Sequence, residues 1–403
     1  MATNSLRAVI AGVDTHADTN HAAVITTTGG RLGDQEFPTT PDGYRLLVEF
    51  IAGFGAVQVV GVEGTNSYGA GLSRHLRETG LRVEEVIRPK RPVRRLRGKS
   101  DPIDAYAAAA AVLAGDDLPT PKNADGDVES IRALNTVRRS GVKARANATR
   151  QIKSLLITAP DLVRSQFRGL TDPILLARLH SLRPGPASQY SAQATLRALR
   201  HLARRQRELT VQITEIDTEI DTLVQRTAPA LRATKGIGPV TAAQLLVTAG
   251  DNPDRIKNES AFAALCGVAP IPASSGKTTR YRLSRGGDRQ ANCALHQIVL
   301  SRMTYDPRTR DYIAKRTADG KSKLEIMRCL KRAVAREVYH LLTNPAEVPR
   351  TDDLRPLRLA RGLTLDDAAN HDSALAKKLS RIERGLARDD ELAEAYRQWL
   401  QAA

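Results

Sequence analysis

The stretch Lys99-Ser100-Asp101-Pro102-Ile103-Asp104-Ala105 decides how the first third of this chain is interpreted. It places two carboxylates three residues apart, directly before an alanine-rich segment with a helical pattern. Because proline suits the first turn of a helix, we expect a helix that begins near Asp101. Asp101 and Asp104 would then lie one turn apart on one face, where they could hold a divalent metal ion. For an isolated pair of this kind, a helix start whose acids only complement the helix dipole is the commoner explanation.

Upstream of this stretch, short β-prone segments alternate with helical patterns. Strands are predicted at residues 7–13, 21–26, 31–37, 57–62 and 81–87, with helices starting at Pro41 and near Tyr68. The glycines and short spacings make the first three strands a meander. The predicted order is βββαβαβ followed by the Asp101 helix, which indicates an α/β domain.

Two further acids stand at the ends of predicted strands. Asp14 ends the first strand and Glu63 ends the fourth. Since the carboxyl ends of neighbouring strands converge on one crevice in an α/β sheet, both acids are expected to meet Asp101 and Asp104. Four such carboxylates would repel one another unless divalent cations neutralised them. Mg²⁺ is the natural candidate because it takes oxygen ligands and substrate phosphates, and Mn²⁺ is its alternative.

The charge of the chain points to a polyanionic partner. Its 403 residues include 61 Lys and Arg against 44 Asp and Glu, a formal net charge of +17. Nucleic acid is the first candidate, because each neutralised phosphate releases counterions. The excess is concentrated directly before Asp101, where the predicted phosphate contacts are Arg94, Arg95, Arg97 and Lys99. Aromatic residues make up only 4%, which argues against base stacking as the main mode of recognition.

Cysteine content and hydropathy bear on the compartment. The three cysteines have no CxxC spacing, which is typical of reduced thiols. The longest apolar run is too short to span a bilayer, and the N-terminus lacks a cationic region followed by an apolar core. We therefore predict a cytoplasmic protein without a membrane partner.

The middle of the chain is predicted to be largely helical. A basic helix is expected from about Asp127 to Lys153, and residues 160–186 are expected to be irregular. Leu209, Ile213, Ile216, Ile220 and Leu223 then alternate steps of four and three, which is a coiled-coil-like seam. Packing within one subunit and packing between subunits are both open for this seam. The glycine turn with Gly236 and Gly238 joins two helical patterns and could expose backbone N–H groups to a phosphate.

The second chemical feature is Pro270-Ile271-Pro272-Ala273-Ser274-Ser275-Gly276-Lys277-Thr278-Thr279-Arg280. Its Gly-Lys-Thr run is not a nucleotide-binding phosphate loop, because that pattern needs glycine at position 271. The prolines are also expected to prevent an ordinary strand before the loop. An exposed serine in this cationic loop could instead be a nucleophile, activated by a metal or base from elsewhere in the fold.

The order of elements is similar to a RuvC or ribonuclease-H fold. Gly12-Val13-Asp14, Val62-Glu63-Gly64-Thr65 and Asp101-Pro102-Ile103-Asp104-Ala105 resemble the acidic signature of the DEDD insertion-sequence transposases. These are serine-dependent, bridge-RNA-guided recombinases. The resemblance covers about residues 7 to 345. It implies that the four acids bind Mg²⁺ and that DNA, a guide RNA and further copies of the chain, in a dimer or tetramer, are the partners.

In the resembled family, a second domain carries a Gly-Leu-x-Pro segment, a Ser-Gly pair, a basic glycine turn and a helix. Counting from Pro270, Ser275 takes the nucleophile position and Ser274 is its neighbour. Lys277, Arg280, Arg282 and Arg285 are then plausible phosphate contacts. The glycine turn resembles a helix-hairpin-helix element. Because the acids and the serine lie in different predicted domains, a complete site could combine two subunits.

The chain is divided into four parts, of which the family resemblance covers the first three and the last departs from the family's usual length. These are a RuvC-like catalytic domain at 1–126, a basic helix and coiled-coil linker at 127–228, a helical serine-bearing transposase domain at 229–345, and an extension at 352–403. In the extension, Leu379-Ser380-Arg381-Ile382-Glu383-Arg384-Gly385 resembles part of a phage-repressor-type helix-turn-helix. A small helical cap is the alternative for this part.

The expected function is therefore DNA transposition or recombination. Ser275 would attack the scissile phosphorus and hold the DNA end as a phosphoserine ester, which can be rejoined without ATP. A second hypothesis is a Mg²⁺-dependent nuclease or Holliday-junction resolvase that uses the same acids and water. A third is a DNA-binding regulator without enzymatic activity. Variants distinguish these three hypotheses. Ser275→Ala should still cut DNA only if water is the nucleophile, and intact recombination in Asp14→Asn or Asp101→Asn would favour the regulator.

Overall fold

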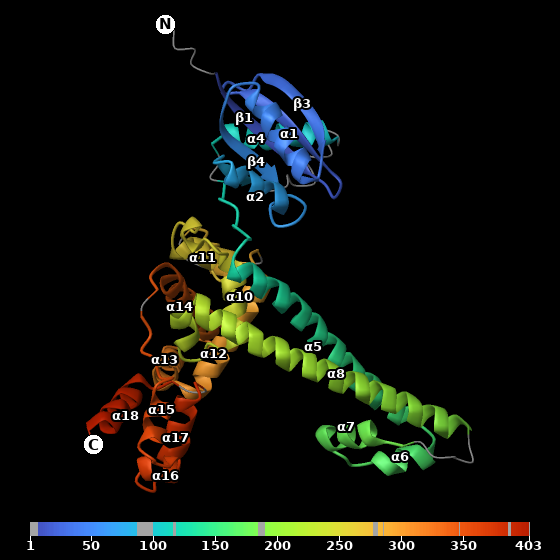
Figure 1. Cartoon of the computed structure of the whole chain (residues 1–403), viewed down its shortest axis with the longest axis vertical. Coiled ribbons are helices and arrows are strands. Elements are labelled where there is room, and N and C mark those ends of the chain that lie inside the picture. Colours follow the sequence, from blue (N-terminus) through green and yellow to red (C-terminus); the bar gives the residue numbers. More distant parts are fainter. Residues whose placement is uncertain are drawn as a thin grey trace. The chain divides into compact units, whose positions relative to one another are not determined.

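The computed structural model describes residues 7–86, 100–115, 118–183, 190–276, 281–284, 286–345, 347–385 and 388–402 (Figure 1). The chain forms two compact units. The first consists of Met1–Ser130 with Ala249–Lys257, and the second of Ile131–Thr248 with Asn258–Ala403. The first contains an α/β sheet and the second is mostly helical, so the predicted mixed fold class is confirmed.

The first unit is built on a five-stranded mixed sheet. Its strands are β1 (Ala8–Thr15), β2 (Thr19–Thr26), β3 (Arg31–Pro38), β4 (Ala56–Glu63) and β5 (Val83–Val86). They lie in the order β3-β2-β1-β4-β5. β1 is antiparallel to β2 and parallel to β4, with Val13 opposite Val62 in the parallel register. The order of strands and helices along the chain is the one predicted from the sequence.

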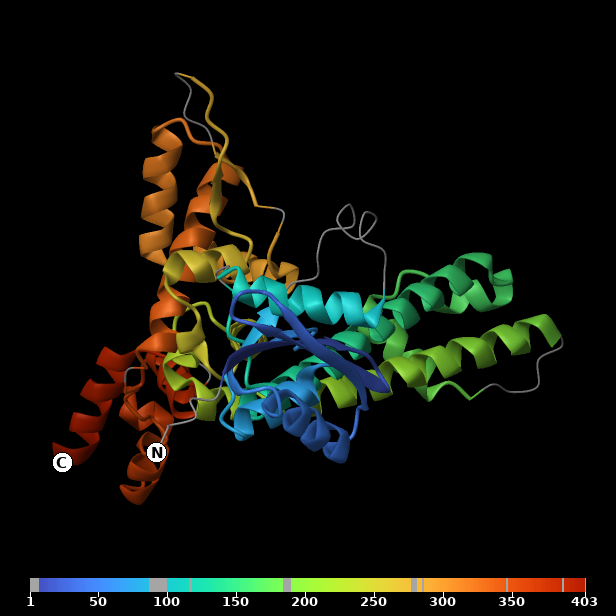
Figure 2. The ribbon, with the colours of Figure 1, turned by 90° about the horizontal axis from the view of Figure 1, so that it is seen from above.

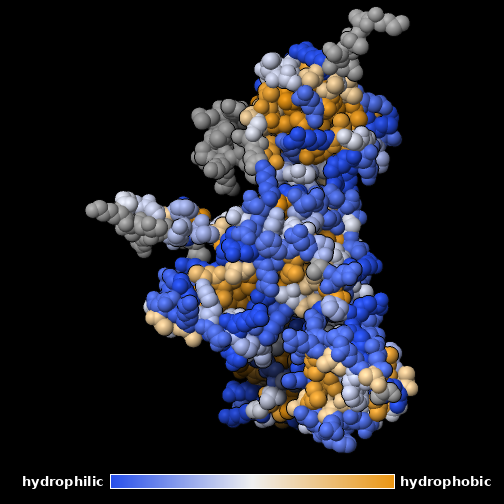
Figure 3. All heavy atoms as spheres, turned by 90° about the vertical axis from the view of Figure 1, so that its left-hand side faces the viewer, coloured by the Kyte–Doolittle hydropathy of each residue, from blue (hydrophilic) through white to orange (hydrophobic). Residues whose placement is uncertain are grey.

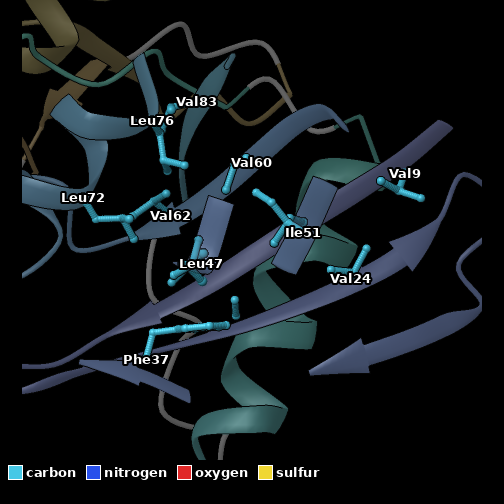
Figure 4. Packing of buried hydrophobic residues seen from close by; sticks show 13 residues of the cluster. Val9, Val24, Phe37, Leu47, Ile51, Val60, Val62, Leu72, Leu76 and Val83 are labelled. Atoms are coloured by element: carbon cyan, nitrogen blue, oxygen red, sulfur yellow. The ribbon is translucent and has the colours of Figure 1, made fainter. Parts of the chain in front are cut away.

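Helices cover both faces of this sheet (Figure 2). Helices α1 (Pro41–Ala52) and α2 (Ala70–Glu78) pack on one face, and α4 (Asp101–Leu113) packs on the other. Alternate residues of a strand point to opposite faces, so Val9 packs toward α1 and α2 while Ile10 packs toward α4. Figure 4 shows the first of these cores, where Leu47 of α1 lies among strand valines.

The approach of α4 to the sheet depends on a glycine in β1. A Cβ atom at Gly12 would lie 2.2 Å from the backbone nitrogen of Ala109 and 2.3 Å from the carbonyl oxygen of Ala105. Both contacts are far shorter than van der Waals distance, so no side chain fits at this position. The alanines of α4 present an equally thin surface, and Ala105 and Ala109 are fully buried. The helix that carries Asp101 is therefore held directly against the central strand.

Long helices open the second unit. The helix α5 (Asp127–Thr158) runs beside α8 (Tyr190–Thr227), with α6 (Asp161–Phe167) and α7 (Asp172–Ser181) between them in sequence (Figure 1). The seam predicted in α8 buries Ile213 and Ile220. Ile213 reaches α5, because a Cβ atom on Gly141 would lie 3.3 Å from its Cγ1 atom. At least part of this seam therefore packs within one chain.

The prediction that residues 160–186 are irregular is wrong over most of this range. Helices α6 and α7 occupy it, while residues 184–186 lie outside the described part. The prolines that suggested irregular structure stand at helix starts, with Pro160 at the N-cap of α6 and Pro173 in the first turn of α7. Proline is tolerated there because the first N–H groups of a helix have no partner within the helix.

The rest of the second unit is helical apart from one hairpin. It consists of α9 (Pro229–Ala233), α10 (Pro239–Ala249), α11 (Glu259–Leu265), β6 (Pro270–Pro272), β7 (Tyr281–Leu283), α12 (Arg289–Tyr305), α13 (Pro307–Ala318) and α14 (Lys323–Thr343). It ends in α15 (Leu354–Ala360), α16 (Leu365–Ala368), α17 (Ser373–Glu383) and α18 (Asp390–Ala402). These last four helices share a core of their own, which includes Leu354, Leu379 and Tyr396.

The prediction that the prolines before the serine loop prevent a strand is wrong. Pro270, Ile271 and Pro272 form β6, which pairs with β7 in an antiparallel two-stranded ladder. Ile271 lies opposite Arg282 in this ladder. Each strand of a two-stranded ladder has a free edge, and proline is tolerated where its missing N–H group faces that edge.

The surface and hydropathy agree with a polar exterior. On the face shown in Figure 3, hydrophilic residues alternate with hydrophobic areas, the broadest of which lies in the upper part of the view. Among the described residues, no helix combines the length and apolar character needed to cross a bilayer. The three cysteines are unpaired, with Cys266 buried.

Candidate active site

The first two acids stand where parallel neighbouring strands end. Asp14 is the penultimate residue of β1 and Glu63 is the last residue of β4. Their exposed fractions are 2% and 3%. The hydroxyl group of Thr15 donates a buried hydrogen bond of 2.7 Å to the carbonyl oxygen of Glu63. This bond ties the two strand ends together.

The other two acids come from the first turn of α4. The helix begins at Asp101, and Pro102 lies in its first turn, as predicted. Asp104 is 6% exposed, whereas the Asp101 side chain is 40% exposed. Ser100 makes no side-chain cap bond, so the first turn presents carboxylates rather than a serine cap. We call Asp14, Glu63, Asp101 and Asp104 the acid cluster.

The charges of the other three acids act on the pKa of Asp14. Burial is the main reason why the pKa of Asp14 is raised above its ordinary value. The charges of Glu63, Asp104 and Asp101 raise this pKa further, while His16 lowers it. All three other acids therefore act on Asp14 through space, although they come from separate parts of the sequence. An arrangement of this kind favours a bound cation.

His16 contacts two members of the acid cluster. It was not predicted from the sequence. Its Nε2 atom lies 3.2 Å from Oδ2 of Asp14 and 3.4 Å from Oδ1 of Asp101. Ligand atoms of these three residues all lie within 4.8 Å of one another. Carboxylate oxygens suit Mg²⁺, and an added imidazole nitrogen suits a transition ion such as Mn²⁺. The residues present therefore fit a divalent cation. In the sequence, His16 could have been predicted from its position two residues after Asp14, just past the end of the same strand.

Ser275 is exposed and follows β6 in the second unit. Gly276, directly after it, has a φ of +54°, a left-handed conformation that glycine adopts without strain. Ser274 is exposed as well. Arg282, a predicted phosphate contact, is exposed in β7. The predicted contacts that lie outside the described residues are Lys277, Arg280, Arg285, Arg94, Arg95, Arg97 and Lys99.

The glycine turn lies between α9 and α10. Gly236 has a φ of +81°. The N–H group of Gly238 donates to the hydroxyl oxygen of Thr241 at 3.0 Å, and that of Ile237 donates to the carbonyl oxygen of Thr234. These two amides are not available to a phosphate while the turn keeps this conformation. The ammonium group of Lys235 lies 3.2 Å from a carboxylate oxygen of Asp306.

Comparison with known families gives two matches to different parts of the chain. A DEDD-type family of IS110 elements, described as a transposase, matches residues 11–159. The family described as Transposase IS116/IS110/IS902 matches residues 228–314. The first match includes the whole acid cluster, and the second includes Ser275.

Individual relatives agree with these matches. The transposase for insertion sequence element IS1328 of Yersinia enterocolitica is 28% identical over 243 residues, which cover 58% of this chain and 69% of the relative. An insertion element IS110 protein of Streptomyces coelicolor is 32% identical over 120 residues, 29% of each chain. A protein of the IS117 mini-circle from the same species is 24% identical over 325 residues, 67% of this chain and 78% of the relative. The chain belongs to the IS110 family of transposases, and DNA is the partner that this family implies.

Proposed function

We propose that this transposase cuts and rejoins DNA through a covalent phosphoserine intermediate on Ser275. The acid cluster would hold the divalent metal ion, with Mg²⁺ as the natural choice. The observation that carries the proposal is the grouping of Asp14, His16 and Asp101, whose ligand atoms lie within 4.8 Å of one another, together with the effect of Glu63 and Asp104 on the pKa of Asp14. Such a cluster is costly for the fold unless a cation neutralises it.

The ligands for the metal ion would come from two places in the first unit. Asp14 and Glu63 supply ligand oxygens from the strand ends, and Asp101 and Asp104 supply them from α4. A divalent cation held there would supply Lewis-acid polarisation of the phosphate oxygens and neutralise their charge. The imidazole of His16 contacts both Asp14 and Asp101.

The reaction proposed at Ser275 exchanges one phosphate ester for another and needs no added energy source. The serine Oγ atom forms a bond to phosphorus, and the bond from phosphorus to a deoxyribose oxygen breaks. The hydroxyl proton passes to a base, and the departing oxygen takes up a proton. In the reverse sense, a strand hydroxyl attacks the phosphoserine ester and releases the serine. Because one ester replaces another, ATP is not needed.

Trapping the protein–DNA adduct tests this proposal. End-labelled DNA carrying the element's own ends is incubated with the chain and Mg²⁺, and denaturing gels reveal labelled protein. The parent chain and the matched control Ser274→Ala should form the adduct, and Ser275→Ala should not. Strand cutting by Ser275→Ala without an adduct would instead support the nuclease or resolvase hypothesis, in which water is the nucleophile. The contacts of His16, a candidate base for water, are the observation that favours this second candidate.

Guidance by RNA and assembly are further parts of the proposal, and both rest on family resemblance. We infer that a bridge RNA encoded beside the gene selects the DNA, and that the chain acts as a dimer or tetramer. Sequencing the RNA that co-purifies with the chain tests the first part, and an RNA unrelated to the neighbouring locus would refute it. Light scattering of the purified complex tests the second part.

We also assign finer fold identities as part of this proposal. The strand order β3-β2-β1-β4-β5, with α4 on the opposite face from α1 and α2, supports a RuvC or ribonuclease-H-like first domain. The glycine turn between α9 and α10 is proposed to be helix-hairpin-helix-like.

In the C-terminal extension, α16 and α17 are joined by a four-residue turn in which Asn370 and His371 have φ values of 49° and 60°. This geometry supports a helix-turn-helix, with α17 as the helix that enters a major groove.

A further inference from the structure

The end of the helical arm made by α5 and α8 carries an uncompensated positive charge. We define the distal arm as residues 150–207, of which 150–183 and 190–207 are described. It contains eleven Lys and Arg residues and two Asp and Glu residues. The next fourteen residues of α8, 208–221, contain five acids and no Lys or Arg. The charge is therefore segregated along one helix rather than mixed as on an ordinary solvated surface.

A small apolar core holds the distal arm together. Ile152 of α5, Phe167 of α6, Leu179 of α7 and Leu199 of α8 belong to one buried cluster. The basic side chains are not needed for this core, because the apolar cluster accounts for the packing of all four helices. The fold thus fixes the positions of the cations on a preformed scaffold, which lowers the entropy cost of binding a partner.

Few of these cations are paired within the chain. Lys153 and Asp172 form an ion pair of 2.8 Å. Arg207 lies 3.1 Å from a ring nitrogen of His180, which is not an acid. In the parts of the distal arm that the structure describes, nine exposed arginines form no ion pair with an acid: Arg150, Arg164, Arg168, Arg178, Arg183, Arg197, Arg204, Arg205 and Arg207. An external anion or salt would relieve the mutual repulsion among them.

We propose that the distal arm binds the phosphate backbone of a nucleic-acid duplex. Arginine forks match phosphate oxygens, and a row of unpaired arginines gains affinity by releasing counterions. Aromatic surface for base stacking is scarce on the described part of the arm. Phe167 is buried, and Tyr190 is exposed but lies under the guanidinium of Arg197. The contact is therefore with the backbone and is independent of sequence. This inference rests on the proposed function, which brings both DNA and RNA to the protein.

The test measures binding rather than strand chemistry. The full chain carrying Ser275→Ala is titrated into two labelled probes, a DNA duplex of about 30 base pairs, roughly three helical turns, and an RNA stem-loop of comparable size. Fluorescence anisotropy gives the Kd over a range of salt concentrations. The test variant adds Arg204→Gln and Arg205→Gln. The matched control instead adds Arg308→Gln and Arg310→Gln, two exposed arginines on α13. A third variant, Arg204→Lys with Arg205→Lys, keeps the charge.

The Gln variant should bind one or both probes roughly 50-fold more weakly at about 0.1 M salt, since each lost phosphate contact removes a factor of roughly eight. Its plot of log affinity against log salt should be less steep by about two. The Lys variant should stay close to the parent. Loss on the DNA probe alone identifies DNA as the ligand, and loss on the RNA probe alone identifies RNA.

Two results would overturn the inference. One is unchanged binding of both probes by the Gln variant, which would leave an acidic protein as the arm's partner. The other is an equal loss in the α13 control, which would show that only total net charge matters. Because no adduct is needed, failure of the serine chemistry would not alter this readout. Exposed positions were chosen so that thermal melting should be unchanged in every variant.

Discussion

Asp14 lies in a place where ionisation opposes folding. Burial, followed by the charges of three other acids, raises its pKa above the ordinary value of 3.8. The folded chain therefore binds a proton at Asp14 more readily than the unfolded chain does. Stability falls as the pH rises from 3.8 through the raised pKa, and the penalty remains at neutral pH. A metal ion removes the penalty by favouring the ionised form.

The variant Asp14→Asn separates these two effects. Without metal at pH 7, it should melt higher than the parent, by on the order of a few degrees, because the ionisation penalty is gone. At a pH below the ordinary aspartate value, this difference should disappear. Mg²⁺ should raise the melting temperature of the parent by more than that of the variant, and activity should be lost. Scanning fluorimetry with Mg²⁺ or a chelator measures all of this. A metal-free variant that melts lower at pH 7 would contradict the argument.

At the scale of elements, the position of α4 depends on the bare backbone of Gly12. In Gly12→Ala, the new methyl group would collide with backbone atoms of Ala105 and Ala109. We expect a loss of about 3 kcal/mol in the free energy of unfolding, at the upper end of overpacking costs. Metal-induced stabilisation should fall as well, because α4 carries Asp101 and Asp104.

Urea unfolding and metal titration check the Gly12 prediction. Gly238→Ala is the matched control, because a Cβ atom there would meet nothing within 4 Å. This control should change the unfolding free energy little. If the two variants were equally stable, close packing of α4 on β1 would not be what places the two acids.

The C-terminal helices depend on one buried ion pair. Nε and Nη2 of Arg358 donate to the two carboxylate oxygens of Glu383 at 2.7 and 2.9 Å, and Tyr396 donates to the same carboxylate at 3.0 Å. The side chains of Arg358 and Glu383 are 8% and 2% exposed. Removing one partner leaves a buried charge, which costs about 3–5 kcal/mol.

Arg358→Met should therefore unfold α15 to α18 well before the rest of the second unit. Limited proteolysis and calorimetry detect this directly. The exposed Arg355 on the same helix provides the control Arg355→Met, which should remain resistant. The double variant Arg358→Met with Glu383→Gln should regain part of the loss, and equal instability of the single and double variants would show that the buried charge is not the cause.

At the scale of the whole molecule, separate cores imply separable parts. All residues of the C-terminal core lie between Leu354 and Leu400. A chain that ends at Pro349 should therefore keep the melting temperature of the remaining helices and form the serine adduct at Ser275. Calorimetry and the adduct assay measure these outcomes. Loss of the main melting transition on truncation would show that the extension is part of a larger core.

The sequence was informative where local rules determine the structure. Strand ends and a proline-marked helix start predicted where Asp14, Glu63 and Asp101 stand, since these features depend on neighbouring residues only. Helices α6 and α7 were missed because their prolines look like breaks, although Pro160 and Pro173 stand at helix starts. The strand β6 was not predicted, because a strand accepts proline only where the missing N–H group faces a free edge, and the sequence does not show which edge is free.

Other features depend on contacts that no local pattern records. The position of His16 beside Asp101 joins residues 85 positions apart in sequence, and it exists only once α4 lies on β1. The pairing of the cations also requires the structure. Arg138 of α5 is paired with Asp217 of α8, whereas Arg204 and Arg205 form no ion pair among the described residues. From the sequence, all of these arginines looked alike.

The charge division within α8 also makes this helix an electric dipole. Its first part, Tyr190–Arg207, carries five arginines and no acid, and the part that follows carries five acids. A dipole in the field of a polyanion experiences a torque that turns its positive end toward the source. As nucleic acid approaches, the arm tip should therefore lead the encounter and the acidic part should be kept away from the phosphates. The direction of approach would then be biased before any specific contact forms, and salt would weaken that bias.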